Sequence, residues 1–123
     1  MDAPKSRIEA LIQNILGESH TVTPQSRVEY ILAAIADGAT YSGDELSRIE
    51  ALLKAIANGG EYTGPVQSRV ERILYAILTG GEYADEPQSR IESLLIEWLN
   101  SSGEYVTESV PYLFRRTGGT VYA

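Results

Sequence analysis

The sequence predicts a mainly α-helical protein built from five repeats of about 21 residues, on the strength of three observations. A Ser-Arg-Ile/Val-Glu tetrapeptide recurs in nearly constant register, an apolar stripe of helical period follows each copy, and a connecting segment follows each stripe. The copies begin at Ser6, Ser26, Ser47, Ser68 and Ser89. Successive serines are 20, 21, 21 and 21 residues apart.

The tetrapeptide has the composition of a helix start. An N-cap serine accepts a hydrogen bond from the backbone N–H three residues later, and a glutamate at that third position bonds back to the serine N–H. In the third repeat these residues are Ser47 and Glu50. One such tetrapeptide is a weak signal, but five in phase predict five helix N-termini.

The apolar stripe occupies the second, fifth, sixth and ninth positions after each serine. In the third repeat these positions hold Ile49, Leu52, Leu53 and Ile56. On a helix they span roughly 100° of the surface, which is the width of a core-facing stripe. The pattern therefore predicts a buried face on each helix rather than a cofactor site.

Glycine marks the predicted helix ends. Gly38, Gly59 and Gly80 each lie twelve residues after their serine, where a left-handed C-cap is expected, and Gly17 comes one residue earlier in its repeat. Each helix is then about 11 or 12 residues long, which is too short to be stable alone in water. The helices must pack against one another.

The connections between helices are long enough to run back along a helix. Eight extended residues reach roughly 26 Å, whereas a twelve-residue helix is only about 18 Å long. Tyr41, Tyr62 and Tyr83 recur fifteen residues after their serines and are expected to be packing anchors. We therefore expect parallel helices with extended returns, stacked as a small right- or left-handed solenoid. The alternative is a compact five-helix bundle.

Parallel stacking predicts a ladder of ion pairs. The arginine and the glutamate of each tetrapeptide lie on opposite flanks of the apolar stripe, so the arginine of one helix faces the glutamate of a neighbour. Arg48 is expected near either Glu29 or Glu71. Arginine suits this role because its guanidinium group binds a carboxylate bidentately.

The predicted array covers residues 1–108, and residues 109–123 form a separate tail. The tail is interpreted as a degenerate sixth repeat or as a C-terminal cap in which Tyr112, Leu113 and Phe114 cover one end of the array. A solenoid of this kind is expected to have two unlike ends, and a partner would dock at those ends or on the repeated outer face.

Composition argues against several function classes. The 123-residue chain has a net charge of −7, which disfavours direct nucleic-acid binding, and it has no cysteine for disulfides or thiolate metal sites. His20 is the only histidine, so imidazole clusters and serine triads are excluded. We expect no enzyme: no catalytic, cofactor-binding or metal-binding residue is predicted, and no small-molecule substrate. No signal peptide or membrane-spanning run is expected.

The modules Pro24-Gln25-Ser26-Arg27-Val28-Glu29 and Pro87-Gln88-Ser89-Arg90-Ile91-Glu92, each followed by a pair of aliphatic residues, resemble short helical modules in phage and prophage structural proteins of Firmicutes. The resemblance covers roughly residues 6–108. It implies a non-catalytic virion or virion-assembly component with a protein partner or self-assembly, located in the virion or the host cytoplasm. The alternative hypothesis is an acidic phage-encoded inhibitor or nucleic-acid mimic that acts on a host protein.

Overall fold

The computed structural model describes residues 3–101, which form five helices and no strand. The helices are α1 (Arg7–Ile15), α2 (Arg27–Asp37), α3 (Arg48–Asn58), α4 (Arg69–Thr79) and α5 (Arg90–Ser101). They coincide with the five predicted repeats, so the all-helical repeat architecture is confirmed. The predicted tail 109–123, including the proposed cap at 112–114, lies outside the described residues.

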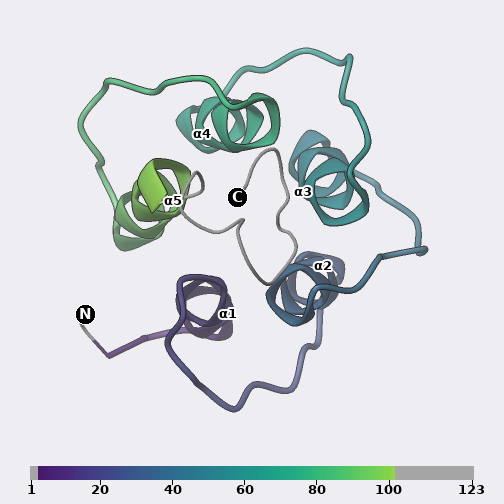
Figure 1. Cartoon of the computed structure of the whole chain (residues 1–123), viewed down its shortest axis with the longest axis vertical. Helices are drawn as coiled ribbons and strands as arrows, with labels where there is room; N and C mark the ends of the chain where they lie inside the picture. The colour runs from purple at the N-terminus through teal and green to yellow at the C-terminus, as the bar shows by residue number, and fades with distance from the viewer. Residues whose placement is uncertain (1–2, 102–123) are drawn as a thin grey trace.

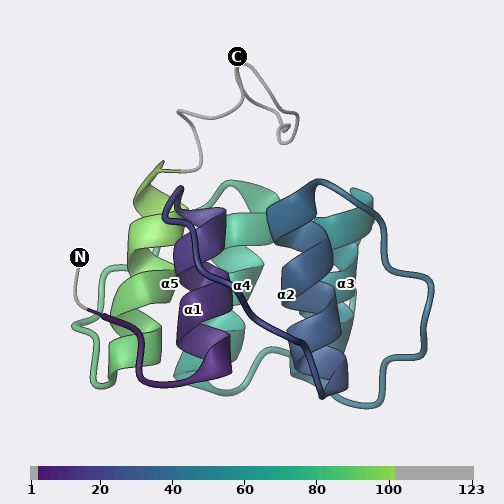
Figure 2. The same cartoon turned by 90° about the horizontal axis from the view of Figure 1, so that it is seen from below.

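The five helices stand parallel around a common axis (Figure 1). Seen from the side, their N-terminal ends lie at one end of the molecule and their C-terminal ends at the other (Figure 2). Each connection therefore runs back along the outside of the molecule before the next helix begins. This is the predicted helix-plus-return repeat.

The array closes into a ring. Helix α1 packs against α5 as well as against α2, and Arg90 of α5 pairs with Glu9 of α1 across the closure. The expectation of two open, unlike ends to the array is therefore wrong. The sequence specifies how each repeat meets its neighbour, but the rotation between neighbours depends on side-chain packing, and here five steps complete a full turn. The molecule is thus a repeat array and a compact bundle at once.

Each helix begins at the predicted serine. The serine Oγ accepts a hydrogen bond of 3.1–3.2 Å from the backbone N–H of the glutamate three residues later, in all five repeats. The glutamate carboxylate, however, accepts from the N–H of the residue before the serine, and not from the serine N–H as predicted. In the third repeat this donor is Leu46, at 2.7 Å from Glu50. Ser47 has an extended backbone (φ −147°, ψ 166°), and the N–H that meets the carboxylate is the one that precedes it.

The predicted glycine caps are present on three helices. Gly38, Gly59 and Gly80 adopt the left-handed conformation with φ of 70–75°, which an L side chain rarely adopts. Helix α1 ends differently, because its C-cap is Leu16 in the right-handed conformation, followed by Gly17. With nine residues, α1 is also the shortest of the five described helices.

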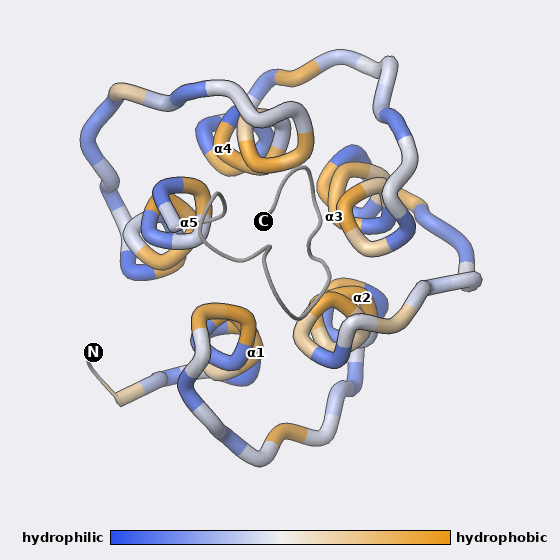
Figure 3. The backbone as a smooth tube through the Cα atoms, in the orientation of Figure 1, coloured by the Kyte–Doolittle hydropathy of each residue, from blue (hydrophilic) through white to orange (hydrophobic). Residues whose placement is uncertain are grey.

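The core lies inside the ring, where the apolar faces of the helices meet (Figure 3). Residues at the fifth and sixth positions are buried in every repeat: Leu11, Ile12, Ile31, Leu32, Leu52, Leu53, Ile73, Leu74, Leu94 and Leu95. Residues at the second and ninth positions are only partly buried, except Trp98. The second and ninth positions lie near the two ends of each helix, so burial is deepest halfway along the axis. The predicted stripe is the core face, as expected.

No helix within residues 3–101 combines the length and the apolar composition that crossing a bilayer requires.

The core predicts a specific stability difference between two leucines. Leu53 is 2% exposed and Leu46 is 69% exposed. We expect Leu53→Ala to lower the free energy of unfolding by about 2–5 kcal/mol, because it removes buried methyl groups and leaves a cavity. The matched control Leu46→Ala should change it by less than about 0.5 kcal/mol. Chemical denaturation of both variants measures the difference; equal losses would contradict the core assignment.

Candidate functional site

The most regular polar feature of the molecule is a closed circle of five ion pairs near the helix N-termini, here called the Arg–Glu ring. The arginine that begins each helix pairs with the glutamate in the first turn of a neighbouring helix. The pairs are Arg7–Glu29, Arg27–Glu50, Arg48–Glu71, Arg69–Glu92 and Arg90–Glu9, with nitrogen–oxygen distances of 2.7–3.2 Å.

The ring runs in one direction. Each arginine binds the glutamate of the following repeat, so Arg48 meets Glu71 and not Glu29, the other partner that the sequence left open. If the array were open, Arg90 of the last repeat and Glu9 of the first repeat would lie at opposite ends and could not pair. Closure of the ring brings them together, with Arg90 Nη2 at 3.1 Å from Glu9 Oε1.

The two members of each pair differ in exposure. The glutamate side chains are only 6–9% exposed, whereas the arginine side chains are 38–48% exposed. A buried carboxylate is unfavourable unless hydrogen bonds compensate its lost hydration. Here each carboxylate accepts from an arginine and from a backbone N–H at 2.7–2.8 Å. Burial and compensation are thus matched at every glutamate.

The surroundings of these glutamates favour their charged form. The Arg48 guanidinium, followed by the Gln67 backbone N–H, lowers the pKa of Glu71 to about 2, against the partial opposition of burial. The pKa of the other four ring carboxyls is lowered as well. For Glu9, Glu29 and Glu50 the largest cause is the arginine; for Glu92 it is the Gln88 backbone N–H. The position in the first helical turn adds the favourable field of the helix N-terminus.

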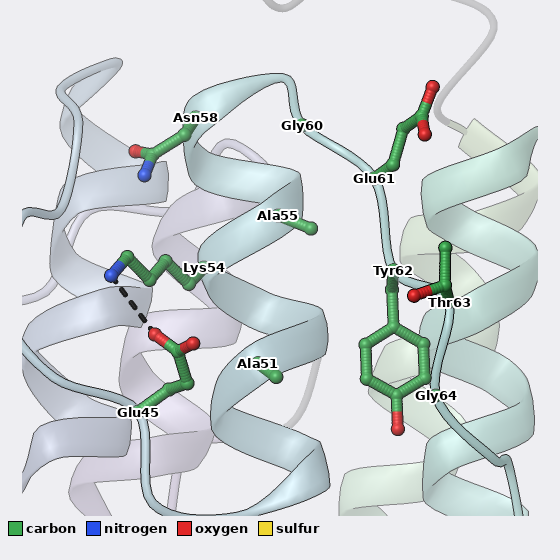
Figure 4. A pocket seen from close by; sticks show the side chains of 10 residues that line it. All are labelled: Glu45, Ala51, Lys54, Ala55, Asn58, Gly60, Glu61, Tyr62, Thr63 and Gly64. Atoms are coloured by element: carbon green, nitrogen blue, oxygen red, sulfur yellow. Dashed lines mark hydrogen bonds and ion pairs between the residues drawn. The ribbon is translucent and has the colours of Figure 1, made fainter.

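A surface groove of about 390 Å³ lies on the outer side of α3. In Figure 4, Ala51 and Ala55 of the helix face the Tyr62 ring across the groove, and Lys54 meets Glu45 on the other side of the helix. Lys54 Nζ donates to the Gly43 carbonyl at 2.8 Å and to Glu45 at 3.0 Å. The groove therefore has apolar side chains at its floor and polar groups along its edge.

The groove exists at α3 because the fourth position of this repeat is alanine. In the next repeat the same position holds Arg72, whose guanidinium carbon lies 5.6 Å from the centre of the Tyr83 ring and whose Nη1 lies 3.6 Å from Asp85. That side chain covers the equivalent tyrosine. At α3, Ala51 leaves the space beside Tyr62 open.

The described residues place no catalytic constellation in this groove. Tyr62 donates its hydroxyl to the Pro65 carbonyl at 2.7 Å. His20 lies in the first connection, where its backbone N–H and carbonyl bond the Asn14 side chain at 2.7 and 3.1 Å, and its Nε2 atom is buried without a hydrogen-bond partner. Within residues 3–101, no group of three or more histidine, aspartate or glutamate side chains is placed to hold a metal ion.

The outer face is not uniform as the repeats predict, because its fourth and seventh positions are exposed in some repeats and buried in others. The inner positions hardly change between repeats, but these outer positions do. In chain order they hold Ala10 and Gln13, Tyr30 and Ala33, Ala51 and Lys54, Arg72 and Tyr75, and Ser93 and Ile96. The first pair is buried, whereas Tyr30 and Tyr75 are 52% and 39% exposed. Comparing the repeats position by position would have found this signal.

Searches with the whole chain find no matching protein-family model, no matching curated protein and no matching solved structure.

The Arg–Glu ring predicts energetic coupling between helices. Arg48→Met and Glu71→Gln should each lower the free energy of unfolding, and the double variant should lose less than the sum of the two, because both changes break the same bond. The control cycle is Arg72→Met with Asp85→Asn, a longer pair with both side chains well exposed, where coupling should be smaller. Equal coupling energies in the two cycles would contradict the view that the Arg–Glu ring is shielded from solvent.

The ring also predicts a dependence of stability on pH. The ring carboxyls have a lower pKa in the folded chain than the usual 4.5, so the unfolded chain binds more protons as the pH falls through that value. The free energy of unfolding should be constant from about pH 7 to 5.5 and fall from about pH 4.5 toward pH 2. In Arg48→Met the free energy of unfolding should fall less steeply, because the variant removes the guanidinium that does most to lower the pKa of Glu71. Denaturation of the wild-type chain and the variant at several pH values measures how steeply stability falls. Equal slopes would show that the Arg48–Glu71 pair does not contribute to the pH dependence.

Proposed function

We propose that the chain is a non-catalytic structural or interaction protein in which an invariant helical ring carries a variable outer surface. The observation that carries the proposal is the division between inner and outer positions. The tetrapeptide arginine and glutamate are identical in all five repeats, and the core positions are aliphatic in all five apart from Trp98. The fourth and seventh positions, some of which are exposed, vary from one helix to the next.

This division separates two physical tasks. The repeated polar residues bind one another: serine caps the helix, glutamate joins its helix to the preceding chain, and arginine joins it to the next helix. Groups engaged in this way hold the shape of the ring and are poor candidates for binding a partner. Tyr30 and Tyr75, at the fourth and seventh positions of their repeats, are exposed, so their side chains are available to contact a partner.

We further propose that the chain is a phage virion or virion-assembly component whose partner is a protein. The support is the resemblance of the repeat module to helical modules of phage structural proteins, together with the rigid ring, which suits a part that must keep its shape within an assembly. Large exposed aromatic side chains such as Tyr30 and Tyr75 have the chemistry that is enriched in protein interfaces.

The alternative, an acidic inhibitor or nucleic-acid mimic in the host cytoplasm, is favoured by the charge outside the ring. Nine exposed carboxylates remain there, against three basic side chains within residues 3–101. The acidic residues are Glu18, Asp37, Asp44, Glu45, Glu61, Glu82, Asp85, Glu86 and Glu97, and the basic ones are Lys5, Lys54 and Arg72. The carboxylates are distributed over four connections and two helices, whereas a mimic concentrates them on one face. We therefore prefer the structural role.

Association with particles tests the proposal. After induction of the phage in its host, particles are purified by density gradient, and the chain is quantified by mass spectrometry in the particle and soluble fractions. We expect the wild-type chain in the particle fraction and less of the variant Tyr30→Ala/Tyr75→Ala, because the variant removes two outward side chains. Core-neutral substitutions of this kind should leave thermal unfolding nearly unchanged, and a thermal melt provides that control.

The distribution between fractions decides between the two roles. A chain that stays in the soluble fraction while the capsid proteins sediment would contradict the virion role. Displacement of DNA from a basic DNA-binding protein by the same soluble chain would instead support the mimic.

A further inference from the structure

The interface between α5 and α1, here called the seam, differs from the other four helix interfaces. Each of the other interfaces joins helices that follow one another in the chain, so a connection spans it on the outside of the ring (Figure 1). Within residues 3–101 no connection spans the seam. Non-covalent contacts alone close the ring there.

Arg90 provides the described polar contacts across the seam. Its Nε and Nη2 atoms lie 3.2 and 3.1 Å from Glu9 Oε1, and Nη2 also donates to the Ala3 carbonyl at 2.9 Å. At the interfaces between consecutive helices, the described hydrogen bonds of the ring arginines go to the glutamate alone. One side chain thus fastens α5 both to α1 and to the segment that leads into α1.

Helix α1 also ends differently from α2, α3 and α4, and it packs less extensively against α5 than against α2. It has nine residues and no left-handed glycine C-cap. The bonds between Asn14 and His20 attach the start of the first connection to α1 itself. In the second connection, by contrast, the Tyr41 backbone bonds the Asn58 side chain of the following helix at 2.8 and 2.9 Å. Residues 21–25 are therefore the segment that links α1, with its own turn, to the rest of the ring.

We propose that the seam is an interaction surface for a second copy of this chain, which docks there by exchange of α1. If α1 leaves its ring, α5 and α2 present the two faces that bind a repeat helix. The α1 of a second copy matches both faces: its Glu9 meets Arg90, and its Arg7 meets Glu29, as in the single chain. Exchange therefore replaces each contact with an identical one, which makes helix exchange a low-cost route to a dimer. The proposal is independent of the phage role.

Closure within one chain is favoured at low concentration, because the linked α1 has an effective concentration in the millimolar range. The wild-type chain should then be mainly monomeric in dilute solution. Exchange becomes observable when closure within one chain is made unfavourable and closure between chains is kept favourable.

Two charge reversals create this situation. Arg90→Glu places two carboxylates at the seam, and Glu9→Arg places two guanidinium groups there, both within one chain and in a dimer of identical chains. When the two variants are mixed, exchange of α1 pairs opposite charges in both rings. We expect a 1:1 complex of about twice 13.5 kDa by native mass spectrometry and light scattering, and at most a small dimer fraction for either variant alone.

The matched control is the same reversal at the α3–α4 interface, Arg48→Glu mixed with Glu71→Arg. The second connection and its Tyr41–Asn58 bonds fasten α3 in place, so this mixture should give at least tenfold less complex. Equal amounts of complex from the two mixtures would overturn the assignment of α1 as the exchanged helix. Absence of complex from the seam mixture, with both variants helical by circular dichroism, would overturn the proposal itself.

A measurement on the wild-type chain covers the case in which a reversal prevents folding. Unlabelled and ¹⁵N-labelled chains are mixed at about 1 mM, held in enough denaturant to remove the helix signal, and returned to native buffer. A dimer of intermediate mass, carrying one chain of each kind, supports exchange. Recovery of monomers alone, from a sample that had lost its helix signal in denaturant, counts against it.

Discussion

The glutamate in the first turn of each helix is the group on which the ring depends. Its carboxylate holds the preceding chain through a backbone N–H and holds the neighbouring helix through an arginine, as Glu71 does with Gln67 and Arg48. Local capping and contact between repeats are thus the work of one side chain. A helix whose start was badly formed would lose its neighbour as well, which couples the formation of short helices to the assembly of the ring.

This coupling resolves a difficulty of the parallel arrangement. Five parallel helices bring five partial positive charges together at one end of the molecule, an unfavourable interaction that antiparallel bundles avoid. A negative side chain in the first turn of every helix offsets it, and the low exposure of the carboxylates makes the offset strong. The same carboxylates then draw in the arginines. The repeated tetrapeptide therefore supplies both the negative charge at each helix N-terminus and its arginine partner.

Local features of the fold were predictable from the sequence, whereas the closure of the ring was not. Ser47 and Gly59 are short-range signals that define a helix by themselves, and the stripe through Leu52 and Leu53 defines its buried face. The parallel direction followed from the length of the connections. The choice of Glu71 over Glu29, and the meeting of Arg90 with Glu9, depend on the sense and size of the rotation between repeats. Those quantities come from packing among many side chains, and no single residue type encodes them. At the groove beside Tyr62, Ala51 stands where the adjacent repeats carry the large side chains of Tyr30 and Arg72, a difference seen only when the repeats are compared position by position.

Closure also limits how the gene can change by duplication. A chain that adds repeats end to end without closing can gain or lose a unit and keep the same interfaces, since each unit contacts only its neighbours. In this ring the fifth unit must meet the first, so the rotation per repeat and the number of repeats are bound together. An in-frame duplication of 21 codons, the spacing of most units, would leave a sixth helix with no place in the circle. The number of repeats is consequently under a geometric constraint. Variation is then expected as single-residue changes on the outer surface of the ring.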